Sequence, residues 1–347
     1  MTSNEPARAE RHARQVRFGP IGPEGQARLR ESHVILVGLG ATGSHAADAL
    51  TRAGVGRLTL VDRDVVEFHN LQRQTLYCEA DAADQRPKAL AAAERLASID
   101  SAVTLDARIA EFDRGLWDRL DPRPQLAMDC TDNFATRFLL NDLAVRDSVP
   151  WIYAGVVGSQ GCTTAILPGV TPCLRCRLSE PPPSGSVATC ETAGVFEPAV
   201  RVVAGLATAT ALRILTGDRD LGLGTLRAVD LWSGRWREHF ADSRPRPECP
   251  TCGTRSFPAL AEAAPERLRM CGRDTVQVRP ALAQAVDFAT IAARLRGVGV
   301  PTETSPHLLR FAVEGCRISL FRDGRALIFG TADPQRAASL YDRWLGG

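Results

Sequence analysis

Lysine is almost absent from this chain. Lys88 is the only lysine, and the other 41 of the 42 basic residues are arginine. A drift of composition towards arginine explains those 41 positions, but it does not explain the one lysine that remains. Lysine presents a compact charge on a flexible stem, and arginine does not replace it freely at a phosphate. Lys88 is therefore a candidate phosphate ligand.

The chain also lacks a strong net charge, a secretory signal and a membrane span. Its formal charge of +2 leaves no electrostatic footprint for nucleic acid. Residues 1–17 are polar, without the apolar core of a signal peptide. The longest apolar stretch, 199–215, contains Arg201 and Arg213 and is typical of a buried helix. Ten cysteines, four of them in CxxC pairs, suit a reducing compartment. We expect a cytoplasmic protein that binds neither nucleic acid nor membrane.

Strand-like and helix-like segments alternate through the first 256 residues. Strands are expected at 33–37, 58–61, 103–105, 126–128, 151–154, 225–230 and 237–240, and helices at 23–31, 44–53, 89–99, 135–147 and 199–215; a region with more turns starts at 163–167. Such alternation predicts an α/β, doubly wound, Rossmann-like domain over 1–256. We expect a linker at 257–270 and a small α+β domain at 271–347, which has its own alternating pattern.

A glycine-rich turn joins the first strand to the first long helix. Gly38, Gly40 and Gly43 form a GxGxxG pattern, in which backbone amides approach a phosphate at the start of a helix. Asp62 lies 19 residues after Gly43, where a carboxylate holds a ribose hydroxyl. This pattern alone is weak, and its usual interpretation is an NAD-dependent oxidoreductase.

The residues that follow argue against hydride chemistry. Asn70, Arg73 and Lys88 would place an amide donor and two cations near the same crevice. A triphosphate develops more charge than a nicotinamide cofactor, and cations aimed at that charge are most valuable there. For Arg73 the alternative is an ordinary surface ion pair.

A carboxylate follows the strand at 126–128. Asp132 lies in the run Asp129-Cys130-Thr131-Asp132-Asn133, at an edge that faces the ligand in an open α/β sheet. Mg²⁺ binds through one or two carboxylates together with phosphate oxygens, so Asp132 is the candidate magnesium ligand. The other role open to Asp132 is to cap the next helix, and the two roles are compatible.

Two CxxC pairs predict a metal centre. Cys173 and Cys176 form one pair, and Cys249 and Cys252 form the other. Prolines and turn residues surround both pairs, and four thiolates with no open position indicate a structural, tetrahedral zinc. The alternative is two unrelated pairs or redox disulfides.

Together these motifs resemble the ThiF/MoeB family, the bacterial relatives of ubiquitin-activating enzymes. The matching pieces run in family order from about residue 8 to residue 253. They are Arg11–Gln15, Gly38–Gly43, Asp62 with Asp64, Asn70–Leu76, Pro87-Lys88, Asp129–Asn133, the two CxxC pairs and Thr189–Val195. The resemblance implies ATP-dependent adenylation of the C-terminal glycine of a small ubiquitin-fold sulfur carrier, in a molybdopterin, thiamine or related sulfur pathway.

The resemblance also implies roles for individual residues. Asp62 would hold the ribose, Asp132 would hold Mg²⁺, and Arg14 would reach the phosphates bound by the other protomer of a homodimer. The residues expected around ATP are Gly38, Gly40, Ala41, Gly43, Asp62, Asp64, Asn70, Arg73, Gln74, Lys88, Asp132 and Asn133. The implied partners are a carrier ending in Gly-Gly and a sulfurtransferase or cysteine desulfurase.

Two features stay open at this point. Cys190 is either an acceptor of the acyl group or of sulfur, since a thiolate attacks an adenylate readily, or a small residue in a loop over the carrier tail. The domain at 271–347 has no cysteine-bearing loop of the rhodanese type found in some relatives. We expect it to support carrier docking or dimerisation. A third interpretation of the whole chain, a binding module that has lost its chemistry, conflicts with the intact set of Arg14, Arg73, Lys88 and Asp132.

Overall fold

The computed structural model describes residues 10–183, 188–218, 221–239, 244–261, 267–269, 274–279 and 285–346. The chain forms two compact units, 1–262 and 263–347, which are described here one at a time.

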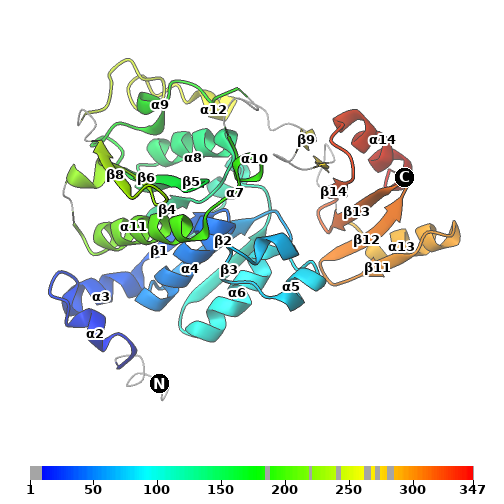
Figure 1. The fold of residues 1–347 in the computed structure, drawn as a ribbon, viewed down its shortest axis with the longest axis horizontal. Coiled ribbons are helices and arrows are strands. Elements are labelled where there is room, and N and C mark those ends of the chain that lie inside the picture. Colours follow the sequence, from blue (N-terminus) through cyan, green and yellow to red (C-terminus); the bar gives the residue numbers. More distant parts are fainter. Residues whose placement is uncertain are drawn as a thin grey trace. The chain divides into compact units, whose positions relative to one another are not determined.

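The first unit is built on an eight-stranded sheet with the strand order β3-β2-β1-β4-β5-β6-β7-β8 (Figure 1). The strands are β1 (His33–Val37), β2 (Arg57–Asp62), β3 (Thr104–Ile109), β4 (Leu126–Asp129), β5 (Trp151–Val157), β6 (Gln160–Ile166), β7 (Leu226–Asp230) and β8 (Arg235–His239). The first five run parallel and the last three are antiparallel. The parallel part has the order of a Rossmann-like sheet, so the predicted fold class is confirmed.

Helices cover both faces of this sheet. They are α2 (Ala13–Val16), α3 (Gly22–Glu31), α4 (Ala41–Ala53), α5 (Glu79–Ala83), α6 (Lys88–Ile99), α7 (Arg114–Asp118), α8 (Phe134–Arg146), α9 (Leu174–Arg177), α10 (Cys190–Ala193), α11 (Glu197–Leu215) and α12 (Pro258–Ala261). Short 3-10 turns occur at Phe68–Asn70 (η1) and Leu221–Gly224 (η2).

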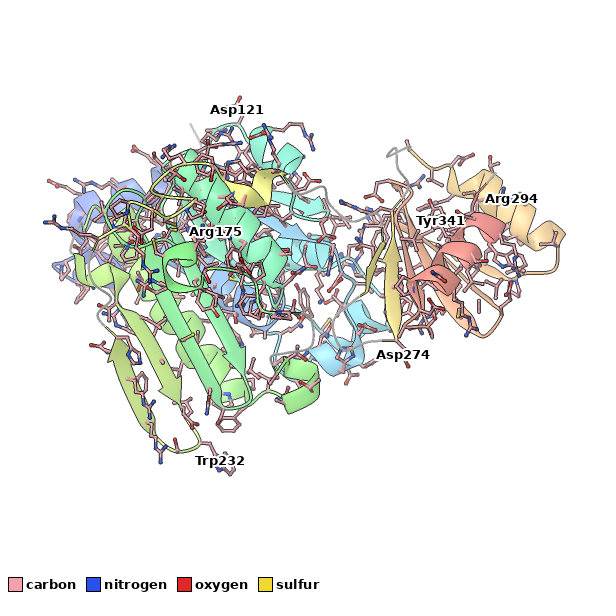
Figure 2. The ribbon with its side chains drawn as sticks, turned by 90° about the horizontal axis from the view of Figure 1, so that it is seen from above. Asp121, Arg175, Trp232, Asp274, Arg294 and Tyr341 are labelled. Atoms are coloured by element: carbon pink, nitrogen blue, oxygen red, sulfur yellow. The ribbon has the colours of Figure 1, made fainter. Side chains whose placement is uncertain are left out.

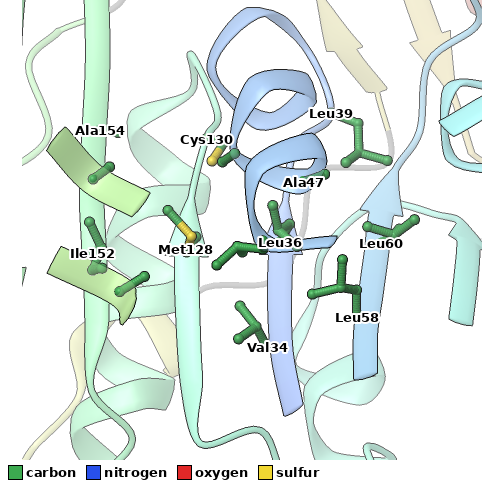
Figure 3. Close-up of a cluster of buried hydrophobic side chains, with 14 of the residues drawn as sticks. Val34, Leu36, Leu39, Ala47, Leu58, Leu60, Met128, Cys130, Ile152 and Ala154 are labelled. Carbon is green, nitrogen blue, oxygen red and sulfur yellow. The ribbon is translucent and has the colours of Figure 1, made fainter. Parts of the chain in front are cut away.

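The alternation of side chains along buried strands divides the core into two layers. Val34 and Leu36 of β1 point to the face covered by α4, α6 and α11 (Figure 3). Ile35 and Val37 point to the opposite face, where they join the cluster that includes Trp117 of α7 and residues of α8. Every residue of β1 is buried, as its continuous apolar run predicts.

The helix α11 is long and apolar enough to cross a membrane by length and composition alone. In this fold it packs against α4, β5 and β6, and over half of its apolar window is buried inside the protein. This is the packing of a core helix, in agreement with the two arginines in the stretch.

The second unit has a six-stranded antiparallel sheet with the order β11-β12-β13-β14-β10-β9 and two helices. Its elements are β9 (Arg267–Arg269), β10 (Thr275–Val278), α13 (Phe288–Gly297), β11 (Thr302–Thr304), β12 (Leu308–Val313), β13 (Cys316–Phe321), β14 (Ala326–Phe329) and α14 (Pro334–Trp344). It has its own apolar core, which includes Phe288 and Leu340.

The range expected to be a linker, 257–270, includes the boundary between the two units and also contains two short regular elements. Helix α12 packs on α8, and the backbone N–H of Ala259 donates to Asp142 Oδ2 at 2.8 Å. Strand β9 pairs with β10 in the second unit. Tertiary contacts hold both short elements, and the local composition of the range does not reveal them.

Candidate functional site

The loops that follow β1 and β4 meet at the switch point of the sheet. Strand β1 lies between β2 and β4, so the carboxyl ends of these strands border one crevice. The glycine turn leaves β1 there, and Asp129–Asn133 leaves β4 beside it. A Cβ on Gly38, which has φ +88°, would lie 2.8 Å from the carbonyl oxygen of Cys130. The two loops therefore touch, and only glycine fits at this contact.

The three glycines of the turn have different tasks. A Cβ on Gly43 would lie 2.0 Å from the carbonyl oxygen of Gly38, so a glycine here lets α4 approach β1 closely. A Cβ on Gly40 meets nothing nearer than Gln74 Nε2, at 3.8 Å. Ala41 begins α4 directly after Gly40. The turn therefore leaves space at the N-terminus of α4, where helix amides favour an anion.

Asp62, at the end of β2, stabilises this turn by hydrogen bonds. Its Oδ2 accepts the N–H of Leu39 at 2.7 Å, and its Oδ1 accepts the N–H of Asp64 at 2.7 Å. Burial raises the pKa of Asp62, while the nearby charge of Lys88 opposes the shift. A buried carboxylate at this position is suited to accept hydrogen bonds from a ribose.

Lys88 is the first residue of α6 and is only 3% exposed. Its Nζ lies 3.4 Å from Asp64 Oδ2, and its backbone N–H donates to the Asp64 carbonyl at 2.9 Å. The lone lysine of the chain is thus held next to the carboxylates at the end of β2. A buried ammonium with one long carboxylate contact retains donor capacity for a further anion.

Two side-chain amides, those of Asn70 in η1 and of Gln74 just after it, each have a polar atom that makes no hydrogen bond to the described residues. Asn70 is fully buried, and its Oδ1 accepts the N–H of Glu67 at 3.0 Å. Its Nδ2, like the Oε1 of buried Gln74, has no hydrogen-bond partner among the described residues. Because a buried unpaired polar atom costs about 1–3 kcal/mol, these atoms fit a ligand-binding role. Arg73, between them in sequence, is half-buried and donates from Nη1 to the His69 carbonyl at 2.8 Å.

Asn133, and not Asp132, caps α8. Asn133 Oδ1 accepts the N–H of Ala135 at 2.9 Å. The alternative role considered for Asp132 is therefore taken by its neighbour, and the Asp132 side chain is exposed at the crevice edge. An exposed carboxylate at this edge has the donor chemistry that Mg²⁺ prefers.

A network behind this loop was not foreseen from the sequence. Arg137 Nε lies 3.0 Å from Asp129 Oδ2, and its Nη1 donates to the Tyr153 hydroxyl at 2.8 Å. Its Nη2 donates to the Thr131 carbonyl. Burial raises the pKa of Asp129, and Arg137 opposes the shift. This buried arginine fixes the turn that presents Asp132. The sequence signals for it were a carboxylate at the end of a buried strand and Arg137 four residues after Asn133.

Arg14 lies at the other end of α4 from the glycine turn of its own chain. The neighbouring Gln15 donates from Nε2 to the carbonyl of Ala53, the last residue of α4, at 2.8 Å. The 13 residues of α4 span about 20 Å. The exposed Arg14 is therefore not brought to the nucleotide loops of the same chain.

The structure brings the four predicted zinc ligands together. The sulfur atoms of Cys173, Cys176, Cys249 and Cys252 all lie within 4.8 Å of one another. Individual Sγ–Sγ distances are 3.9 Å for the first CxxC pair, 3.6 Å between Cys173 and Cys249, and 3.3 Å between Cys176 and Cys252. A tetrahedral zinc with its usual bond lengths needs sulfur atoms about 3.8 Å apart, so this donor set fits the metal.

Cys190 begins α10, and the position of its side chain lies outside the described residues. The backbone after this short helix joins the end of β5. The N–H of Gly158 donates to the Gly194 carbonyl at 3.0 Å, and the N–H of Phe196 donates to the Gly158 carbonyl at 2.8 Å. The segment with Cys190 thus reaches the same edge of the sheet as Asp132.

A Rossmann-like sheet with a phosphate-type glycine turn defines a nucleotide-binding class of protein, and its four-cysteine cluster could hold a metal ion. The ThiF family model matches residues 12–251. The chain belongs to the ThiF family, and the predicted family is confirmed.

Named relatives agree with this assignment. The sulfur carrier protein ThiS adenylyltransferase of Bacillus subtilis is 42% identical over 97% of this chain and 99% of its own length. The sulfur carrier protein adenylyltransferase of Thermus thermophilus is 36% identical over 70% of this chain and 90% of its own. Among solved structures, Escherichia coli MccB with MccA-N7isoASN has a TM-score of 0.60 at 20% identity. It matches 73% of this chain and 75% of that chain, and this likeness concerns the fold alone.

Proposed function

We propose that this protein is an adenylyltransferase that uses ATP to activate the C-terminal glycine of a small ubiquitin-fold sulfur carrier. The products are the carrier's acyl-adenylate and pyrophosphate. The observation that carries the proposal is the buried Lys88, held beside Asp62 and the glycine turn in a chain with no other lysine. The B. subtilis relative, similar over nearly its whole length, supports a ThiS-type carrier of a thiamine pathway as the substrate.

The residues divide into three tasks at the switch point. Gly38, Gly40, Ala41 and Gly43 receive phosphate oxygens on backbone amides. Asp62 and Asp64 hold the ribose side of the nucleotide. The phosphates are contacted by Asn70, Arg73, Gln74 and Lys88. Asp132 and Asn133 lie at the edge of the crevice where Mg²⁺ would bind.

The reaction needs no general base. A C-terminal carboxyl group has a pKa of about 3.5, so the attacking carboxylate is already an anion at neutral pH. The enzyme must align it with the α-phosphate and reduce the repulsion between two anions. Lys88 and Arg73 supply positive charge of this kind, and the buried Lys88 does so where little water screens it.

Two metal ions are proposed, each at its own site. Asp132 would hold Mg²⁺, which supplies charge neutralisation on the phosphates when it is bound. The four cysteines would hold a structural zinc, because their sulfur atoms leave no place for a substrate ligand.

Arg14 acts on the nucleotide of a second copy in a homodimer. The distance along α4 between Arg14 and the glycine turn supports this role, because the arginine cannot serve its own site from there. A sulfurtransferase or cysteine desulfurase would then replace the adenylate with sulfur. Cys190 is proposed as a site where the acyl group or sulfur can be held. A cytoplasmic location suits this cysteine usage, because free thiols and metal-binding CxxC pairs are typical of a reducing compartment.

The test is ATP–[³²P]pyrophosphate exchange with a panel of carriers that end in Gly-Gly. We expect exchange that depends on one carrier and on Mg²⁺. Silence with every carrier, or binding of NAD in place of ATP, would contradict the proposal and return attention to peptide substrates or an oxidoreductase.

A further inference from the structure

Helix α2, which contains Arg14, has no apolar anchor of its own. It has four residues, and none of these four, all of which the structure describes, is buried. A helix of about one turn is not stable by itself in water, because nucleation costs more free energy than so few hydrogen bonds return. If Arg14 acts on a second copy, it has to be presented in one direction. The polar contacts that hold α2 therefore bear on the proposed reaction.

Gln15 attaches α2 to the C-terminal end of α4. Its Nε2 donates to the carbonyl of Ala53 at 2.8 Å and to Gln26 Oε1 at 2.7 Å. Gln26 Nε2 donates to the same Ala53 carbonyl at 3.1 Å. The last carbonyls of a helix have no partner within the helix, and one carbonyl oxygen accepts two hydrogen bonds. Both amides therefore share an acceptor that α4 leaves open. We call Gln15, Gln26 and the Ala53 carbonyl the glutamine anchor.

The surroundings of the glutamine anchor are well packed. Gln26 is 2% exposed and belongs to α3, whose Leu29 is fully buried in the core. Figure 1 and Figure 2 show α3, in blue, at the margin of the first unit. Gly54 follows the anchor with φ +81°, and a Cβ there would lie 2.8 Å from Gln26 Nε2 and 2.7 Å from His12 Nε2. The glycine thus leaves the space that the Gln26 amide and the His12 ring occupy.

The glutamine anchor also sets the direction of Arg14. Arg11, just before α2, donates from Nη1 to the carbonyl of Ile99 and lies 3.8 Å from Asp100 Oδ2. The segment is therefore held on both sides of Arg14. Consecutive residues of an α-helix are turned by about 100° from each other. Because Gln15 is directed at α4, Arg14 is turned away from this contact and is exposed.

We propose that Gln15 is a positioning residue of the adenylation reaction: through the glutamine anchor it holds α2 so that Arg14 is presented to the phosphates bound by a second copy. This inference rests on the proposed function and on its homodimer. Gln15 acts through Arg14 and not on the nucleotide of its own chain, because its amide lies at the end of α4 opposite the glycine turn. The chain that donates Arg14 therefore needs Gln15, and the chain that binds the nucleotide does not.

The substitution Gln15→Glu breaks the anchor at constant side-chain size. A carboxylate has no donor for the Ala53 carbonyl, and its charge lies beside the negative end of the α4 dipole. We expect the kcat of carrier-dependent pyrophosphate exchange to fall at least about tenfold, because a displacement of about 1 Å at a reacting group costs up to about 100-fold. The KM for the carrier and the melting temperature should stay close to wild type, since α2 buries none of its four residues. Gln335→Glu, the same change at an exposed position of α14, is the matched control.

Mixed dimers show which chain needs Gln15. Two affinity tags isolate dimers of one Arg14→Ala chain and one Lys88→Ala chain, and each such dimer has a single working site. When Gln15→Glu is added to the Lys88→Ala chain, which donates Arg14, the activity should fall at least about tenfold. When it is added to the Arg14→Ala chain, which binds the nucleotide, the activity should not change. A merely structural role of Gln15 would not distinguish the two placements.

The outcomes separate this inference from the proposed function. Equal activity in the two placements would overturn the inference, and so would a normal kcat in the Gln15→Glu homodimer. Gln15→Ala removes the anchor without adding charge and should give the same order of activities. If wild type is active but the Arg14→Ala/Lys88→Ala mixed dimer is not, Arg14 does not act across the dimer and the anchor has no task in the reaction. Absence of exchange in wild type would refute the proposed function, and the inference with it.

Discussion

At the scale of single residues, Lys88 is the side chain of the site whose surroundings are best defined. Its side chain is buried beside Asp64, so the larger guanidinium of an arginine would have to be accommodated in a buried site. We expect Lys88→Ala to lower carrier-dependent pyrophosphate exchange by about 100-fold or more, the usual loss for a buried charge aimed at a transition state. Lys88→Arg should not restore the rate, because overpacking a buried site costs about 1–3 kcal/mol.

The control for this prediction lies on the same helix. Arg95 is exposed on α6, so Arg95→Ala should keep full activity and stability. Thermal unfolding of all three variants separates a local loss of charge from a damaged fold. Full exchange activity in Lys88→Ala would remove the lysine from the mechanism.

Part of the residue-level site was accessible from the sequence and part was not. The glycine turn, Asp62 and Lys88 follow from motif spacing, because their chemistry depends on positions close together in the chain. Helix capping, which Asn133 performs, was considered only as an alternative role for Asp132, one position away, because capping depends on the residue where the helix begins. The ties from Arg137 to Asp129 and Tyr153 join separate strands, and no local pattern encodes them.

At the scale of elements, the cysteine cluster joins the segment after β6 to the segment before α12. Thr251, between two of the cysteines, donates to Asp142 of α8, so the cluster also fastens to the core. We expect one zinc per chain by elemental analysis. A strong chelator should release it and lower the melting temperature, because a bound structural metal stabilises the folded state.

Single cysteine substitutions test the same centre. Cys252→Ser should lose the zinc and unfold at lower temperature, whereas Cys78→Ser, at an exposed cysteine outside the cluster, should keep both metal and stability. Metal-free protein with an unchanged melting temperature would show that the four thiols have no structural metal.

Helices α7 and α8 are joined by a charged contact that predicts a pH dependence. The guanidinium of Arg146, followed by the Nε1–H of Trp117 at 2.7 Å, holds the pKa of Asp147 below its usual value. The pair therefore stabilises the folded state above the ordinary aspartate pKa of about 3.9, and this stabilisation is lost as the pH falls through the lower folded pKa. Asp147→Asn should cost about 1 kcal/mol at neutral pH, and the difference from wild type should disappear in acid.

Urea unfolding in steps from neutral to acid pH measures this difference. In an Arg146→Ala background, the pH-dependent part of this difference in the free energy of unfolding should shrink, because the main cause of the lowered aspartate pKa is gone. A difference that does not change with pH would mean that the contact acts by packing alone.

The long elements of the fold were predictable, and the short ones were not. Strand β1 has a continuous apolar run, and helices α4 and α6 have apolar residues at helical spacing, so the sequence indicates the type of each. Helices α5, α7 and α9 have four or five residues each, and β9 and β11 have three. Segments this short are held by caps and tertiary contacts, as α7 is by Asp113 Oδ1 accepting the N–H of Leu116 at 2.7 Å.

At the scale of the whole molecule, we expect the second unit to be separable from the reaction. The T. thermophilus relative matches 250 residues that make up 90% of its own length, so it has no room for a comparable unit. The B. subtilis relative aligns over 337 residues, which must include most of this unit. We expect the chain cut after residue 262 to keep its zinc and to bind ATP.

Carrier affinity and oligomeric state of the shortened chain test the role expected for the second unit. If the second unit supports docking, its removal should raise the KM for the carrier. If it supports dimerisation, the shortened chain should be a monomer in light scattering. If neither changes, that role is wrong.

If Arg14 acts on the nucleotide of a second copy, as we propose, the homodimer and not the single chain is the unit of catalysis. Arg14→Ala and Lys88→Ala should each be inactive alone. In a mixed dimer, the nucleotide loops of the Arg14→Ala chain would receive the intact Arg14 of the other chain, so one complete site is restored. Random reassortment of equal amounts should recover about a quarter of the wild-type exchange activity, since half of the dimers are mixed and each has one working site. If Arg14 served its own chain, each site would lack one residue and mixing would recover nothing. The paired variants Arg73→Ala and Lys88→Ala, both proposed for the same chain's site, are the control that should not complement.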